Sequence, residues 1–515
     1  MAQNQKATRR EWIGLAVIAL PCLLYAMDLT VLYLAVPHLT ADLKPSSSQL
    51  LWIVDIYGFL VAGFLITMGT LGDRIGRRRL LLIGAAAFGA ASVLAAFSTS
   101  ATMLIATRAL LGITAATLAP STLSLIRNMF HDPHQRTVAI GIWGTSFSLG
   151  GAIGPLLGGV LLEHFWWGSV FLINVPVMVL LLAVGPKLLP EFRDPNAGRL
   201  DVASAALSIG AVLAVIYGLK RVAENGFGWL PVASILAGLV IGYAFVRRQR
   251  KLADPLIDMR LFRVPAFSTA LAVNTFSIFV ALGSFLFIAQ YLQLVLGLSP
   301  LQAGLWTVPS SIGFVVGSMT TPLIARHVRA VYLMAGGLVF AAIGFGLFAQ
   351  VDGTSGLALV VIGSTVMALG ISPAVILGTD TIVTAAPPER AGAASAISET
   401  GTEFGGALGI AVLGSIGTAV YRSSMTDAVP AGVAPAAAEA ARSTLGGAVA
   451  VAEQFPALLG PAREAFAQSM QLTTSVCAII ALTTAIVAVA VLRRMPGAVP
   501  KQPQNLNAAR AEESP

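Results

Sequence analysis

Five ionisable residues of this sequence lie inside long apolar stretches. They are Asp28, Asp55, Arg108, Glu399 and Glu403. An ionisable side chain at the middle of a lipid bilayer costs about 2.5–3.5 kcal/mol or more unless it faces a cavity or a partner. A carboxylate that has lost its water favours the protonated form, so it can release a proton when a cation arrives. These residue types therefore predict a site at which protons and cations compete within a membrane.

The two aspartates lie at different depths. Asp28 is roughly 22 Å from the start of its apolar stretch at 1.5 Å per residue, whereas Asp55 lies near the far end of the next stretch. We predict that both face one cavity and bind a proton or a cation. The alternative for each is a structural aspartate held by hydrogen bonds.

Glu399 and Glu403 are four residues apart, so they share one face of a helix. Two carboxylates placed in this way repel each other when both are ionised, and at least one prefers to keep its proton. We predict a proton relay or a second cation contact. The alternative is that the helix begins later and that both are wetted at the membrane surface. We assign Asp380 to the interfacial zone.

Arg108 is the basic residue that falls within a predicted span. A guanidinium keeps its proton in a protein, so Arg108 needs hydrogen-bond acceptors. Backbone carbonyls and a nearby carboxylate can supply them in a purely structural role.

Aromatic side chains accompany both aspartates. Tyr25 precedes Asp28 by three residues on the same helical face, and Trp52 and Tyr57 bracket Asp55. Aromatic rings bind cations through their faces, so we predict that these three contact a lipophilic cation. Packing or lipid contact is the alternative. More distant candidates are Trp143, Phe147, Phe276, Phe279, Tyr291 and Trp306.

The elements that position these residues are membrane helices. Apolar residues make up 56% of the 515 residues and charged residues only 11%, against about 25% charged in a soluble domain. This composition excludes a water-soluble enzyme. A membrane span needs about 20 apolar residues, and fourteen such stretches predict an all-α integral membrane protein. They are 13–36, 50–71, 80–98, 102–125, 137–162, 167–187, 202–219, 229–246, 267–292, 302–325, 331–350, 357–382, 393–420 and 471–492.

The distribution of basic residues predicts the orientation. An even number of spans places both termini on one side, and most of the 32 lysines and arginines fall on that side. Such loops are cytoplasmic, so we predict a multi-pass protein of the plasma or inner membrane with both termini cytoplasmic. The same bias explains the net charge of +8 without a nucleic-acid partner. The basic residues expected on the other side are Lys44, Lys220, Arg221, Arg422, Arg442 and Arg463.

Two longer segments interrupt the spans. The basic segment 247–266 separates spans one to eight from spans nine to fourteen, and we take it as a cytoplasmic linker. The Ala-rich segment 421–470 is expected outside the membrane, as short helices or as an irregular loop. Spans seven and eight carry no ionisable residue that we expect deep in the bilayer, because Asp201 and Lys220 lie at their edges. We predict a structural or lipid-contact role for these two spans.

The loop between spans two and three reads GTLGDRIGRRRLL and contains Gly69, Asp73, Arg74, Gly76 and Arg77. A carboxylate, tight glycine turns and a row of arginines can lock neighbouring helix ends together and release them when the helices move. Anchoring by positive charge alone is the alternative, but it does not need the glycine and aspartate spacing.

Span five is rich in glycine, with Gly150, Gly154, Pro155, Gly158 and Gly159. Glycines let helices approach closely and a proline permits a bend. We predict a gating helix between two bundles.

These patterns resemble the major facilitator superfamily. The loop at 69–81 matches its G-x-L-a-D-r-x-G-r-k-x-x-l signature, and Arg108 with Gly112 resembles its l-x-x-x-R-x-x-x-G motif. The glycines of span five look like its antiporter motif. A second copy of the arginine loop, IARHVRA after span ten, is degenerate. The segments MDLTVLYLAVP and LWIVDIY, with fourteen spans, resemble the fourteen-span drug:proton antiporters, including the QacA-like and SmvA-like quaternary-ammonium exporters.

The resemblance implies a fold of two six-helix bundles, at 13–187 and 267–492, with two inserted helices at 202–246. It implies proton-coupled multidrug efflux of lipophilic and quaternary ammonium cations by alternating access, with Arg108 taking part in proton coupling. We expect small cationic drugs, protons and membrane lipids as partners, a monomer, and more than one proton per cation. The alternative is a dedicated exporter of one antibiotic, lipid or metabolite with the same fold.

An enzyme or sensor is not expected. The sequence has no Walker-type Gly-Lys loop, no His/Cys metal cluster and no nucleophile–His pattern. Cys22 and Cys477 lie in apolar stretches and are expected to pack. We therefore predict no metal and no cofactor, with the proton gradient as the energy source.

Overall fold

The computed structural model describes residues 6–191, 193, 201–226, 228–252, 255, 257–353, 356–386, 391–430 and 432–493. Regular structure within these residues is helical, and none of them forms a strand. Fourteen helices, or pairs of consecutive helices, are long and apolar enough to cross a membrane. The all-α fold class is thereby confirmed.

The first half of the chain forms one bundle of long helices with short helices between them. Its helices are α1 (Arg9–Leu43), α2 (Ser47–Ile75), α3 (Arg77–Ala96), α4 (Ala101–Ala115), α5 (Leu118–Met129), α6 (Pro133–His164), α7 (Ser169–Leu172) and α8 (Asn174–Leu188). Two more helices follow, α9 (Val202–Asn225) and α10 (Trp229–Gln249).

The second half begins after a short 3₁₀ turn, η1 (Leu261–Arg263). Its helices are α11 (Pro265–Gln290), a π-helical turn η2 (Tyr291–Val295), α12 (Pro300–Ile324), α13 (Ala330–Phe348), α14 (Leu357–Ala385), α15 (Ala391–Ala428) and α18 (Leu459–Leu492). Between α15 and α18 lie α16 (Pro435–Ser443), α17 (Leu445–Ala450) and the 3₁₀ turn η4 (Pro456–Leu458). The segment 421–470 therefore contains two short helices, together with the ends of the two long ones.

Local signals in the sequence set several helix starts. Ser46 caps α2, and Gln49 hydrogen bonds back to the Ser46 backbone to complete a capping box. Ser299 and Gln302 make the same arrangement at α12, where Pro300 occupies the first helical turn. These caps fix where the chain turns back into a helix, and so fix the register of Trp52 and Asp55 on α2.

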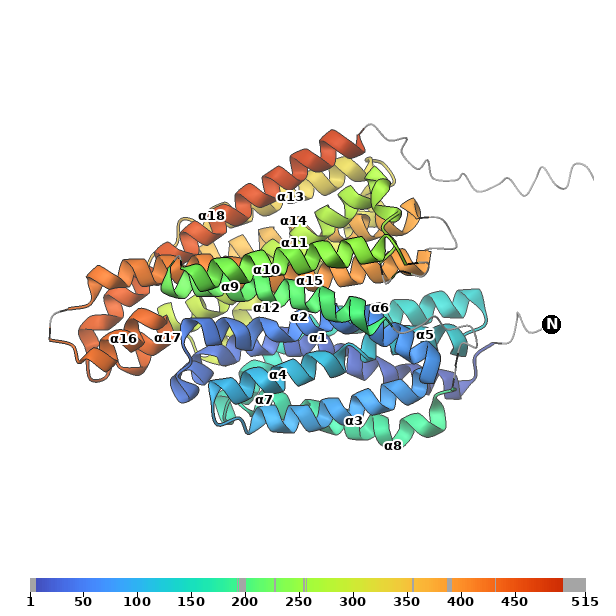
Figure 1. The fold of residues 1–515 in the computed structure, drawn as a ribbon, viewed down its shortest axis with the longest axis horizontal. Helices are drawn as coiled ribbons and strands as arrows, with labels where there is room; N and C mark the ends of the chain where they lie inside the picture. Colours follow the sequence, from blue (N-terminus) through green and yellow to red (C-terminus); the bar gives the residue numbers. More distant parts are fainter. Residues whose placement is uncertain are drawn as a thin grey trace, which may run out of the picture.

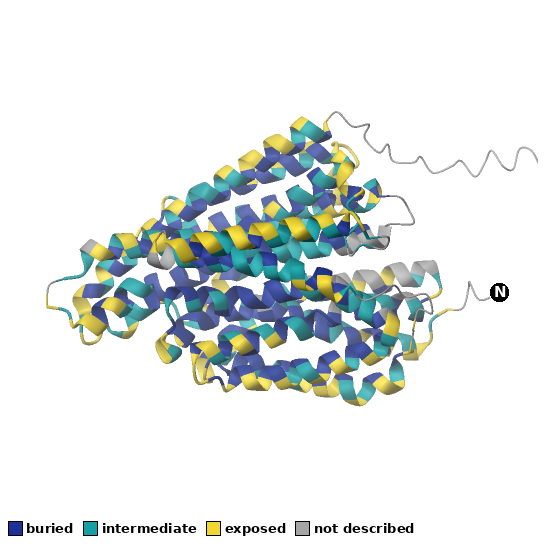
Figure 2. Cartoon of the chain, viewed as in Figure 1, coloured by how far each residue is buried: buried dark blue, intermediate teal, exposed yellow. Residues whose placement is uncertain are grey.

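The helices form two bundles, and α9 and α10 run across the region where the bundles adjoin (Figure 1). α9 packs against α10, α2 and α15, so it touches one helix from each bundle. α10 lies outermost, and exposed residues run along it in Figure 2. Val240 and Tyr243 are each 68% exposed there, as is expected of a helix that faces lipid.

The two bundles touch at the end that carries α16 and α17, away from the N-terminus, and diverge toward the opposite end (Figure 1). At the joined end the Tyr33 ring of α1 lies 5.3 Å from the Phe285 ring of α11. The side-chain amide of Gln293 donates to the Leu34 carbonyl at 3.1 Å. These contacts close one end of the molecule.

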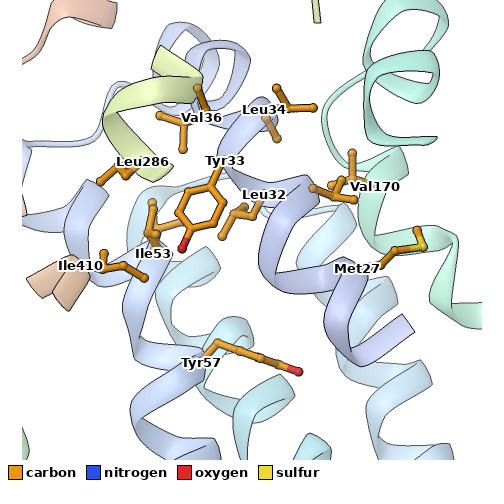
Figure 3. Close-up of a cluster of buried hydrophobic side chains, with 14 of the residues drawn as sticks. Met27, Leu32, Tyr33, Leu34, Val36, Ile53, Tyr57, Val170, Leu286 and Ile410 are labelled. Carbon is orange, nitrogen blue, oxygen red and sulfur yellow. The ribbon is translucent and has the colours of Figure 1, made fainter. Parts of the chain in front are cut away.

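Figure 3 shows buried side chains around Tyr33, one of the residues that close this end. Tyr33 lies among Ile53 of α2, Leu286 of α11 and Ile410 of α15. Because these residues come from both halves, their burial stabilises the closed end through apolar contact.

Candidate cation and proton site

A buried ion pair joins α1 to α4. The Nη1 of Arg108 donates to Oδ2 of Asp28 at 2.5 Å, and its Nε donates to the Ile53 carbonyl of α2 at 3.2 Å. Arg108 is fully buried and Asp28 is 6% exposed. The Tyr57 ring covers the guanidinium, with 4.5 Å from Cζ to the ring centroid. Arg108 thus has the carboxylate and backbone acceptors that its charge requires.

Gly112 permits this arrangement. A Cβ at Gly112 would stand 2.6 Å from the Tyr57 carbonyl oxygen, so only glycine lets α4 lie this close to α2. Gly112 follows Arg108 by four residues on the same face, and the close approach brings the guanidinium within reach of α1.

The two glutamates of α15 face the same region from the other half. Glu403 lies against the hydroxyl of Tyr25 and within electrostatic range of Tyr57. Glu399, one turn earlier, lies near Glu403 and Cys22. The structure places both glutamates among the helices of the first half.

The residues Asp28, Arg108, Tyr25, Tyr57 and Glu403 form what we call the central cluster. Its members come from α1, α2 and α4 of one half and α15 of the other. Among the described residues, the hydroxyl of Tyr57 and the Nη2 of Arg108 have no hydrogen-bond partner. Buried donors are normally paired, so these two can serve a carboxylate or ligand that enters the cluster.

A row of aromatic rings continues from the central cluster to α6. The ring centroids of Tyr57 and Tyr25 are 6.2 Å apart, those of Tyr25 and Phe147 are 5.7 Å apart, and those of Phe147 and Trp143 are 4.8 Å apart. Phe147 and Trp143, which the sequence marked only as distant candidates, therefore lie beside Tyr25. The row offers aromatic faces of the kind that organic cations bind.

A second buried ion pair lies on α2 and α9. The Nζ of Lys220 is 2.9 Å from Oδ1 and 2.8 Å from Oδ2 of Asp55, and 3.8 Å from the centroid of the Trp52 ring. Lys220 and Asp55 are each 1% exposed. We call Asp55, Trp52 and Lys220 the Asp55 triad.

The Asp55 triad adds to two expectations. Lys220 lies near the end of the candidate span Val202–Val222, as expected, but its side chain is buried and turned inward onto Asp55. Asp55 and Asp28 also have separate cationic partners rather than one shared set. Trp52 shares a helix face with Asp55, whereas Tyr57 lies about 200° further around α2 and faces Arg108 instead.

A cavity of about 810 Å³ lies between the α9–α10 pair and the helices α2, α11 and α15. Its walls are almost entirely apolar. They include Phe59 of α2, Ile216 of α9 and Phe404 of α15. Phe404 neighbours Glu403 in the sequence but lines this outer cavity, so α15 has one face toward each region.

The arginine loop after α2 pairs with Glu191 and contacts α5. Gly76 has a φ of 109°, which favours glycine, and a Cβ there would stand 2.5 Å from Oε1 of Glu191. Glu191 accepts from the backbone N–H of Arg78 at 3.1 Å and lies 3.4 Å from its Nε. Arg77 is buried and donates to the Pro120 carbonyl at 3.4 Å.

The sequence also singled out Gly69, Asp73 and Arg74 in this loop. Arg74 is exposed, and a Cβ on Gly69 would meet only Pro120, at 3.8 Å. The side chain of Asp73 falls outside the described part of the structure. The pair of Arg78 and Glu191 was missed because Glu191 lies more than a hundred residues downstream, and no local pattern marks it.

The glycines of α6 pack this helix onto both halves. A Cβ would stand 2.2 Å from the Leu23 carbonyl oxygen at Gly150, 2.2 Å from Thr30 Oγ1 at Gly154, and 2.7 Å from Val31 Cγ1 at Gly158, all on α1. On the other side, a Cβ at Gly159 would stand 2.8 Å from Leu301 Cα, and one at Gly304 would stand 2.4 Å from the Pro155 carbonyl oxygen. Their use in gating stays a prediction.

Asp380, Cys22 and Cys477 belong neither to the central cluster nor to the Asp55 triad. Asp380 is exposed on α14, while Cys22 and Cys477 are buried with free thiols. Among the residues that the structure describes, no group of three His, Cys, Asp or Glu side chains has the arrangement of a metal site. The site therefore consists of carboxylates, fixed cations and aromatic rings.

Two helical bundles with a buried charge cluster between them form an arrangement typical of secondary transporters. The sequence profile of the Major Facilitator Superfamily matches residues 18–410, and the chain belongs to this family. It is 45% identical over 490 residues to the multidrug efflux pump LfrA of Mycolicibacterium smegmatis, covering 94% of this chain and 97% of that protein.

Other relatives carry related names. The methyl viologen resistance protein SmvA of Salmonella typhimurium is 35% identical, with 90% of this chain and 95% of that protein covered. The tetracenomycin C resistance and export protein of Streptomyces glaucescens is 33% identical, over 79% of this chain and 76% of that protein. The inward-facing, unoccupied structure of a bacterial homologue of the lysosomal transporter Spinster has a TM-score of 0.67 at 19% identity, over 95% and 98% of the two chains, and supports the fold.

Proposed function

We propose that this protein exports lipophilic monovalent cations across the cell membrane in exchange for protons, by alternating access. The observation that carries the proposal is the central cluster, in which Glu403 of one half faces Tyr25, Tyr57 and the Asp28–Arg108 pair of the other. The name of the relative LfrA, a multidrug efflux pump, supports drug export, and that of SmvA, a methyl viologen resistance protein, supports an organic cation as the substrate.

The chemistry follows from competition for carboxylates. Glu399 and Glu403 lie one turn apart on one face of α15 and repel each other when both are ionised, and we propose that in the absence of a cation they hold at least one proton. A lipophilic cation that enters among Tyr25 and Tyr57 stabilises the ionised carboxylates and releases the proton. Arg108 stays charged throughout and keeps Asp28 compensated in both states.

The closed end and the divergent end together describe one of the two states of alternating access, and the other state requires the divergent end to close and the closed end to open. With both termini cytoplasmic, the divergent end opens the central cluster to the cytoplasm and inner leaflet, where the substrate binds. The contacts of Tyr33, Phe285 and Gln293 must break for release on the other side. We propose that one chain suffices, because both bundles belong to the same polypeptide.

The membrane potential limits the stoichiometry. Moving one positive charge against 100 mV costs about 2.3 kcal/mol, and one entering proton only cancels that charge. Two or more protons let the potential contribute, and the central cluster together with Glu399 has carboxylates enough for two. We propose electrogenic exchange, and a zero current during turnover in proteoliposomes would contradict it.

The test uses proteoliposomes with a pH-sensitive dye inside and an imposed pH gradient. Ethidium or a quaternary ammonium should trigger proton movement in the wild type. Glu403→Gln and Asp28→Asn should abolish it, while Glu453→Gln, an exposed residue between α17 and η4, should not. If no cation moves protons in the wild type, cation antiport is wrong.

A dedicated exporter is the second candidate, because relatives at 33% and 35% identity are named for the export of tetracenomycin C and cephamycin. Equilibrium binding of chemically unrelated cations separates the two candidates. A dedicated exporter refuses most of them, whereas a multidrug exporter binds several with similar affinity.

A further inference from the structure

Lys220 and Asp55 lie one helical turn from residues that line the apolar cavity, although neither of them lines it. On α9, Ile216 and Val212 line the cavity one and two turns before Lys220, and on α2, Phe59 lines it one turn after Asp55. Residues four apart lie on one face of a helix, so the ion pair lies about 5.4 Å, one turn, beyond the cavity wall. The cavity is therefore apolar, and the buried ion pair lies one turn behind the part of its wall that Phe59 and Ile216 form, where Trp52 packs against them.

The Asp55 triad contains the groups that recognise an organic cation. Asp55 supplies a buried carboxylate, and Trp52 supplies an aromatic face 3.8 Å from the positive charge of Lys220. An aromatic face beside a desolvated carboxylate is a strong arrangement for binding an ammonium group. In this structure the ammonium is the protein's own, so Lys220 stands where the charge of a ligand would bind.

We propose that the cavity and the Asp55 triad form a second site for lipophilic monovalent cations, and that Lys220 is a tethered cation that occupies the position of the ligand's charge. A cation that binds there buries its apolar body between α9, α10 and α15 and displaces the ammonium of Lys220 from Asp55 and Trp52. The inference rests on the proposed function and adds a site outside the central cluster. It also gives α9 and α10 a role, because they wall the cavity and carry the competing charge.

Occupation of the site by Lys220 lowers its affinity for a ligand. If Lys220 occupies the site most of the time, the apparent affinity for a ligand is the intrinsic affinity multiplied by the small fraction of time that the site is free. Lys220→Gln removes the charge but keeps an N–H donor for Asp55. This variant should bind about one additional equivalent of tetraphenylphosphonium per protein, at concentrations at least about tenfold below those needed to fill the site in the wild type.

Three controls test the assignment in equilibrium binding to the purified full chain. Arg221→Met removes the neighbouring basic residue of α9 and should leave binding unchanged. Adding Asp55→Asn to Lys220→Gln should remove the additional equivalent, because the carboxylate is lost. Adding Val212→Trp should also remove it by filling the cavity. A folded Lys220→Gln protein that binds no more tetraphenylphosphonium than the wild type overturns the proposal.

A second experiment leaves the ion pair intact, in case Lys220→Gln does not fold. Val212→Trp in the wild-type chain should raise the KM for tetraphenylphosphonium transport several-fold, whereas Val240→Trp on the exposed face of α10 should not. An unchanged KM for Val212→Trp overturns the second site. The binding assay tests the second site without any transport. A wild type that transports no cation would therefore contradict the proposed function and leave the test of the second site intact.

Discussion

Among the residues that the structure describes in the first half of the chain, two buried carboxylate–cation pairs differ in what surrounds them. The pair of Asp28 and Arg108 lies at the interface of the bundles, near Glu403, with a free donor on Arg108 within the described residues. The pair of Asp55 and Lys220 lies beside an inserted helix, with both carboxylate oxygens within 2.9 Å of the ammonium.

The comparison separates two uses of the same residue types. Arg108 cannot lose its proton and binds several acceptors at once, so its pair is a permanent part of the interface. Lys220 has one carboxylate partner and one aromatic face, so its charge can be replaced by another cation. The role of a carboxylate within the membrane therefore depends on its cationic partner and on its neighbours, and not on its depth alone.

The largest expected effect comes from breaking the interface pair. Arg108→Met leaves Asp28 buried without a counter-charge and should cost about 3–5 kcal/mol of stability. Unfolding in detergent and transport in proteoliposomes both measure this loss. Arg108→Lys keeps the charge but not the planar fork, so it should recover stability only in part. A stable and active Arg108→Met protein would show that the pair is dispensable.

The second prediction concerns the Asp55 triad. Asp55→Asn leaves Lys220 buried and unpaired, so this single variant should be strongly destabilised. Combining it with Lys220→Met should recover part of the loss, with a coupling energy of up to about 3 kcal/mol in a double-mutant cycle. Additive effects would mean that the two side chains do not stabilise each other.

A smaller effect is expected where α6 supports the helix that carries Asp28. A Cβ at Gly154 would stand 2.2 Å from Thr30 Oγ1, whereas Gly151 has nothing within 4 Å. Gly154→Ala should cost about 1–3 kcal/mol by overpacking, and transport should fall as α1 shifts. Gly151→Ala is the matched control and should keep the wild-type melting temperature. Equal behaviour of the two variants would refute the close packing of α6 on α1.

The smallest effect concerns the start of α9, which carries Lys220. Burial raises the pKa of Asp201, but hydrogen bonds from Ser204 and the guanidinium of Arg248, 3.0 Å away, outweigh it and hold the pKa below its usual range. A lowered pKa means that Asp201 stabilises the fold above the unfolded value of about 3.9 and loses this effect as the pH falls below it.

This contribution should amount to about 0–1 kcal/mol, because the pair is partly exposed to solvent. Asp201→Asn should therefore lower the melting temperature slightly at pH 7, and the difference from the wild type should shrink toward pH 3. A difference that grows in acid would mean that the ion pair does not stabilise α9.

Much of the architecture was predictable from the sequence. The lengths of the apolar stretches gave the fourteen candidate spans and the all-α fold, because a helix must satisfy its own backbone hydrogen bonds in lipid. The spacing of the glycines in span five predicted a helix that packs closely, and Gly150, Gly154 and Gly158 do meet α1 closely. The ends were less predictable, as α15 runs to Ala428.

The partners of the site residues were not predictable. Nothing local links Arg78 to Glu191, or Asp55 to Lys220, which is separated from it by 165 positions. Lys220 does lie near the end of its span, but the burial of its side chain was not predictable, because the sequence does not say which way a helix turns. The roles of the candidate residues in transport stay predictions.

The sequence by itself determined the membrane class, the spans and the family, because hydrophobic length and motif spacing are local along the chain. Only the tertiary structure decided which carboxylate received which cation. Packing between distant helices places Arg108 on Asp28, Lys220 on Asp55 and Glu403 against Tyr25. Electrostatic interactions strengthen when water is excluded, and the exclusion of water from these pairs is a property of the assembled bundles.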